Sequence, residues 1–128
     1  MAKIERFEDL QSWQKARQLA NMVYELTEHP TFIKDFRLSN QIQGAAGSVM
    51  HNIAEGFDSG TNIEFIRFLK ISRRSASEVQ SELYLALDRN YINQDELNKA
   101  YHLATETKKL INGLIAYLRK SNSSKPTK

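Results

Sequence analysis

The longest helical pattern in the chain runs from Thr61 to about Arg89 and sets the length of any fold built around it. Apolar residues recur there at intervals of three and four. Thr61 is followed three residues later by Glu64, which is the capping-box pattern that begins a helix. At about 1.5 Å per residue this segment forms a rod of roughly 43 Å, the longest that the sequence predicts.

Three further segments carry the same helical period. They run from about Leu10 to Glu28, from about Phe36 to Glu55, and from Asn93 to about Leu118. Asp9, Asp35 and Asn93 are the predicted N-caps of these helices. Pro30 stops the first helix, and Gly56 is expected to end the second in the left-handed conformation.

The connections between these segments are short, so consecutive helices are expected to be antiparallel neighbours. The sequence therefore predicts an all-α fold, an antiparallel up-down-up-down four-helix bundle. Hydrophobic residues make up 41% of the 128 residues, and only five glycines and two prolines interrupt them, which suits long helices in one domain. Residues 1–120 are assigned to the bundle, and residues 121–128 to a basic, disordered tail.

Several functional classes lack their sequence patterns. The chain has no cysteine, no glycine-rich phosphate loop and no nucleophile elbow, and none of its three histidines follows a glutamate by three residues as a di-metal bundle site requires. We therefore expect no enzymatic activity, no metal and no cofactor. The N-terminal residues lack a signal-peptide core and no stretch is apolar enough to span a bilayer, which predicts a cytoplasmic protein without membrane contact.

A polar layer is predicted between the second and third long helices. Antiparallel pairing about the intervening turn places Gln41 near Ser75 and Glu78. Two interpretations are open, namely a hydrogen-bonded layer that fixes the register of the helices and a ligand site.

Glu55 raises an electrostatic question, because a carboxylate is disfavoured at the negative end of its own helix dipole. The turn brings it beside the start of the next helix, whose first amides lack helical partners. The expected arrangement is a clasp. Glu55 accepts hydrogen bonds from amides of residues 61–63, while Asn52 bridges to the loop and Gly56 allows the turn.

A second row of apolar residues lies beside the predicted core stripes. Its members, on the two C-terminal helices, are Ile66, Tyr84, Leu103, Leu110 and Tyr117. One interpretation is an interface of a homo-oligomer, and the other is a broad core face within a single chain.

Basic residues form a ridge on the outer face of the third long helix, with further cations near the C-terminus. The candidate phosphate-binding residues are Arg67, Lys70, Arg73, Arg74, Arg119 and Lys120. Solvated surface charge is the alternative interpretation. The formal net charge is only +3, but a ridge repeated around an oligomer would attract a nucleic-acid backbone in a salt-dependent way.

Three stretches resemble a known family. FEDLQSWQKARQLANMVYELT, AAGSVMHNIAEGF and FIRFLKISRRSASEV are similar to the four-helix-bundle proteins encoded by intervening sequences of bacterial 23S ribosomal RNA genes, over about residues 6–118. The most specific piece is residues 52–56. Gln43 and Gly44 stand where the family tends to carry basic residues, and Arg74 stands where it usually has glycine.

The resemblance implies a ring-like homopentamer related to the accessory protein of diversity-generating retroelements, which binds nucleic acid. RNA binding is the supposed role of the family itself. The leading hypothesis is thus a non-enzymatic, homo-oligomeric bundle, expected to be a pentamer, that binds RNA or other nucleic acid with little base readout. The alternative is a scaffold for a protein partner that has no direct nucleic-acid role.

Overall fold

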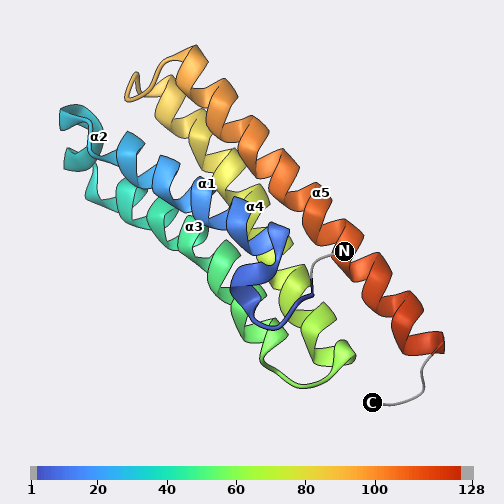
Figure 1. Cartoon of the computed structure of the whole chain (residues 1–128). Coiled ribbons are helices and arrows are strands. Elements are labelled where there is room, and N and C mark those ends of the chain that lie inside the picture. Colours follow the sequence, from blue (N-terminus) through green and yellow to red (C-terminus); the bar gives the residue numbers. More distant parts are fainter. Residues whose placement is uncertain (1–2, 125–128) are drawn as a thin grey trace.

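Four long helices pack side by side in the computed structural model, which describes residues 3–124 (Figure 1). In chain order the elements are a 3-10 turn η1 (Phe7–Asp9), α1 (Gln11–Thr27), α2 (Pro30–Lys34), α3 (Phe36–Phe57), α4 (Asn62–Asp88) and α5 (Gln94–Ser124). The described residues contain no strand. The predicted all-α fold is confirmed, and α5 extends four residues into the segment assigned to the tail, whereas residues 125–128 lie outside the described range.

The long helices alternate in direction, and each packs against two neighbours. α1 contacts α3 and α5, while α4 contacts α3 and α5 on the other side (Figure 1). The inward stripes meet in one core, in which Leu19, Val23, Ile42, Val49, Leu69, Val79, Leu83 and Ile111 are fully buried. Burial of these branched side chains is the main stabilising contribution to the bundle.

Three of the four predicted caps form. Asp35 accepts from the Leu38 amide at 3.1 Å, and Thr61 accepts from the Glu64 amide at 3.2 Å. Asn93 and Glu96 form a complete capping box, because each side chain accepts from the other residue's amide.

The remaining cap prediction is wrong. Asp9 accepts from the amides of Glu5 and Arg6, so it caps the start of η1, while α1 begins after Leu10 without a side-chain cap.

Gly56 does not end α3, which corrects the second predicted helix end. The helix continues through it to Phe57, and the left-handed glycine of this loop is Gly60, with φ of 99°. Gly56 is instead needed for close approach to α4. A Cβ on Gly56 would lie 2.8 Å from Cδ1 of Phe65 and 2.9 Å from Cβ of Phe68.

The pairing of α3 with α4 is displaced from the prediction, at Ser75 by seven residues or about two turns of α3. Ser48 rather than Gln41 meets Ser75, with their hydroxyl oxygens 2.9 Å apart. Ser72 donates to the carbonyl of Val49 at 2.6 Å. The observed register therefore places a serine layer at the centre of this helix pair.

Candidate nucleic-acid interface

The outer seam between α4 and α5 is held by a regular series of contacts. Arg73 donates to Oδ1 of Asn112 at 2.8 Å, and Lys108 donates to the Ser77 hydroxyl at 3.0 Å. From Arg73 to Ser77 the chain advances four residues along α4, and from Asn112 to Lys108 it goes back four residues along α5. The antiparallel pairing thus brings cations from two distant parts of the chain to one seam.

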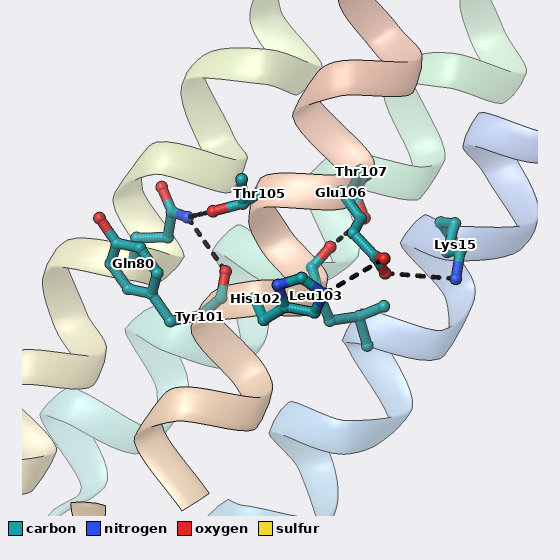
Figure 2. Close-up of polar contacts among 8 residues, drawn as sticks. All are labelled: Lys15, Gln80, Tyr101, His102, Leu103, Thr105, Glu106 and Thr107. Carbon is teal, nitrogen blue, oxygen red and sulfur yellow. Dashed lines mark hydrogen bonds and ion pairs between the residues drawn. The ribbon is translucent and has the colours of Figure 1, made fainter. Parts of the chain in front are cut away.

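The middle of the seam is closed by Gln80. Its amide nitrogen donates to the Tyr101 carbonyl at 3.2 Å and to the Thr105 hydroxyl at 2.9 Å, as Figure 2 shows. Gln80 is buried, so its amide hydrogens are satisfied by the facing helix and not by solvent. These contacts fix the spacing of α4 and α5 next to the cations.

A groove of about 420 Å³ lies along the basic part of this seam. It is lined by Lys70, Arg73, Arg74, Ser77, Lys108 and Asn112. No carboxylate in the described part of the chain forms an ion pair with any of the four cations. No direct ion pair therefore cancels any of these charges, and the two hydrogen-bonded cations, Arg73 and Lys108, are held by neutral partners.

The other predicted phosphate contacts lie outside this groove. Arg67 is paired with Glu64 at 2.9 Å and its guanidinium lies 5.0 Å from the centre of the Phe68 ring. Arg119 and Lys120 are exposed near the C-terminal end of α5. The structure thus brings Lys70, Arg73 and Arg74 together and adds Lys108, which the sequence analysis did not select.

The predicted clasp around Glu55 is wrong. The Glu55 side chain is exposed, and within residues 3–124 it has neither a hydrogen bond nor an ion pair. Asn52 donates backward to the carbonyl and the hydroxyl of Ser48, both at 2.9 Å. Because α3 extends to Phe57, Glu55 precedes the turn and faces solvent instead of the amides of α4.

Gln41 and Glu78 also lie outside the serine layer. Gln41 lines a separate recess of about 350 Å³ together with Arg37, Leu85 and Arg89. Glu78 lies one turn from Glu82 on α4, close enough to act on its carboxyl group. Burial and the Glu78 carboxylate raise the pKa of Glu82 to about 7. The sequence analysis did not select Glu82, and the four-residue spacing of these two acids on one helix is the signal that could have identified the pair.

The predicted interface residues do not share one surface. Leu103 is a core residue, only 8% exposed, which excludes it from an outer face and corrects its assignment. Ile66 is half-buried against the core, and Leu110 lines a groove between α1 and α5. Tyr84 and Tyr117 remain exposed, on α4 and α5 respectively.

The groove between α1 and α5, of about 540 Å³, contains a small ionic cluster (Figure 2). Glu106 is 3.3 Å from the Lys15 ammonium and 3.2 Å from Nε2 of His102. The hydrogen bond from Lys15 lowers the pKa of Glu106. The negative charge here is paired, so this groove offers less net positive charge than the α4–α5 groove.

Residues 3–124 contain no group of three histidine, aspartate or glutamate side chains placed to hold a metal ion. None of the helices assigned in this range combines the length and apolar character that a bilayer crossing requires.

Comparisons with known proteins agree with the fold. Similarity extends to a crystal structure, at 1.70 Å resolution, of a protein of unknown function from the S23 ribosomal protein family of Bacteroides thetaiotaomicron. The two chains are 25% identical and superpose with a TM-score of 0.74, over 81% of this chain and 97% of that one. A search of curated proteins gave no match. The sequence profile of the 23S rRNA-intervening sequence proteins matches residues 8–113. The chain therefore belongs to the 23S rRNA-intervening sequence protein family.

Proposed function

We propose that this protein is a non-enzymatic, homo-oligomeric RNA-binding bundle that holds phosphates in the α4–α5 groove. The observation that carries the proposal is the set of four cations, Lys70, Arg73, Arg74 and Lys108, that line one seam and form no ion pair with any carboxylate of the described residues. Arginine guanidiniums present paired N–H donors that match phosphate oxygens, and lysine adds a mobile point charge. Family membership supports a ribonucleic acid as the polyanion, since the family is described by its 23S rRNA intervening sequences.

The groove suits contact with a nucleic-acid backbone. It is shallow and polar, and its side chains are long cations with two short hydrogen-bonding partners, Ser77 and Asn112. Phosphate contacts of this kind fix position on the nucleic acid and carry little sequence information. We therefore expect affinity to depend strongly on salt and weakly on base sequence.

A salt titration tests this function. Wild type is compared with the triple variant Arg73→Gln, Arg74→Gln, Lys108→Gln in filter binding to a structured RNA. If all three cations contact phosphates, the slope of log Kobs against log salt becomes shallower by about 2 to 3 units, at roughly 0.7 per contact in single-stranded and 0.9 in double-stranded segments. The change should appear together with weaker binding at low salt.

The matched control removes three cations elsewhere, in the variant Arg17→Gln, Lys34→Gln, Lys99→Gln, so that the net charge of the two variants is equal. These residues are exposed and lie on α1, α2 and α5 outside the groove. The control should retain the wild-type slope. Undetectable binding of wild type at low salt, or equal slopes in both triple variants, would contradict the proposal.

A protein scaffold is the second candidate, and exposed apolar side chains favour it. Phe36 at the start of α3 is 71% exposed, and Ile63 at the start of α4 is 68% exposed. Exposed apolar residues at the two ends of the bundle suit protein contacts more than phosphate contacts. Nuclease treatment of a native pull-down separates the two functions, because a scaffold keeps its protein partner after the RNA is digested.

A further inference from the structure

The α4–α5 seam continues beyond the basic groove to an exposed aromatic ring. Lys70, Ser77 and Tyr84 are separated by seven residues each, so they lie on nearly the same line along α4, with a drift of only about 20° per step. Seven residues correspond to about 10 Å along the helix axis. Tyr84 therefore lies in line with the cations, on the same open face of the seam.

Tyr84 has a defined support from α5. Its ring centre is 5.9 Å from that of Tyr101 and the two planes meet at 71°, an edge-to-face contact. Figure 2 shows the Tyr101 side chain directed toward α4 beside Gln80, which hydrogen-bonds the Tyr101 carbonyl. Despite this contact, Tyr84 is 50% exposed. The ring is thus held by a neighbour while half of its surface stays open to solvent.

An aromatic ring in line with a row of cations is the arrangement by which proteins bind single-stranded nucleic acid. The cations follow the backbone, and a base stacks on the ring without being read for its sequence. Bases of an RNA duplex are already stacked on each other and their edges lie in a shallow groove, so they cannot cover a side chain in this way. Stacking on such a ring would therefore favour single-stranded RNA over a duplex.

We propose that the ligand of this seam is single-stranded RNA, with phosphates over Arg73 and Lys108 and one base stacked on Tyr84. The proposal rests on the proposed RNA-binding function and specifies its substrate. Asp88 is exposed one turn beyond Tyr84, and its negative charge repels a polyanion. The part of the seam that favours a polyanion therefore ends near Tyr84. A base at Tyr84 thus lies at the edge of the bound segment.

The test uses a single-stranded RNA of about ten nucleotides that carries the fluorescent base 2-aminopurine, which is quenched when it stacks. Tyr84→Leu should weaken binding of this RNA by about fivefold or more and remove the quenching. Its salt dependence should stay that of wild type, since no cation is lost. Tyr84→Phe keeps the ring and should retain both the affinity and the quenching.

Two controls separate stacking from other effects. Tyr24→Leu removes a similarly exposed tyrosine from α1 and should leave affinity and quenching unchanged. A fully paired RNA duplex should bind wild type and Tyr84→Leu equally. Circular dichroism and light scattering are recorded for every variant, so that a loss of RNA affinity is attributed to stacking only at unchanged helicity and mass.

The outcomes distinguish base stacking on Tyr84 from the proposed RNA-binding function on which it rests. If the Arg73, Arg74 and Lys108 variant loses RNA while Tyr84→Leu keeps wild-type affinity and quenching, the base contact is wrong and the phosphate groove stands. A changed mass of Tyr84→Leu at unchanged RNA affinity likewise overturns the base contact. If neither wild type nor any variant binds RNA at low salt, the proposed function itself fails.

Discussion

At the scale of single residues, Glu82 is the most unusual group in the described structure. Its side chain is only 8% exposed, and its Oε1 has no hydrogen-bond partner. Desolvation by burial is the largest cause of its raised pKa, and the adjacent Glu78 carboxylate adds to it. Glu82 therefore resists ionisation in the folded protein, whereas it ionises freely in the unfolded chain.

This difference predicts a stability that falls with rising pH. The pKa of Glu82 is about 7 in the folded protein against an ordinary value of 4.5. The stability that this group contributes to the folded protein is therefore fully present below pH 4.5 and is lost as the pH rises from 4.5 to 7. Glu82→Gln removes the ionisation and should raise the free energy of unfolding at about pH 8 by on the order of 1–3 kcal/mol. Urea unfolding at several pH values measures it.

The control is Glu25→Gln, which neutralises an exposed acid on α1. It should leave the pH dependence of stability parallel to that of wild type. A Glu82→Gln protein whose stability falls between pH 5 and pH 7 as steeply as wild type would show that Glu82 is not the responsible group.

At the scale of helix elements, the close packing of α4 on the C-terminal part of α3 depends on Gly56. Gly56→Ala places a methyl group within 3 Å of Phe65 and Phe68, and neither a ring packed in the core nor a Cβ atom can yield without backbone movement. We expect a loss of about 1–3 kcal/mol, the usual cost of overpacking. Thermal unfolding followed by circular dichroism measures it as a lower Tm.

Gly44 on the same helix provides the matched control. It is exposed, in the helical interior, and a Cβ there would meet no atom within 4 Å. Gly44→Ala should therefore stabilise the protein by about 0.5–1 kcal/mol through helix propensity alone. If both substitutions changed the Tm equally, close helix packing at Gly56 would not be the reason for its glycine.

The helices themselves could be predicted, because their period and their caps are local properties. Thr61 and Asn93 mark helix starts correctly by side-chain chemistry that needs no tertiary partner. The five-residue helix α2 was missed because it is too short to show a period. The role of Gly56 was missed because glycine is required there by the nearby ring of Phe65, and the two residues meet only when α3 and α4 are packed together.

The candidate site was predictable in the same limited sense. The ridge of Lys70, Arg73 and Arg74 follows from the positions of these residues on a single helix. Lys108 and Asn112 join it only through the pairing of α4 with α5, which no local pattern specifies. Tyr84 was predicted at a protein interface and is exposed in the structure, and exposure alone does not distinguish such an interface from the stacking surface that we propose.

At the scale of the whole molecule, oligomerisation decides how strong the positive field becomes. One chain presents four groove cations, and a ring of five chains would present the same groove five times. Repetition around a closed ring would let one RNA contact several grooves, which raises overall affinity without any new contact. The proposed function is therefore sensitive to assembly even though each groove lies within one chain.

Light scattering on purified protein measures the assembly directly. A pentamer of 14.8 kDa chains has a mass of about 74 kDa. Tyr117, 65% exposed on α5, is the most exposed member of the predicted interface row, so Tyr117→Lys should shift the mass toward that of one chain by burying an unpaired charge. Tyr24→Lys, on α1 and outside that row, should keep the wild-type mass. A wild-type mass of one chain at micromolar concentration would contradict the oligomer.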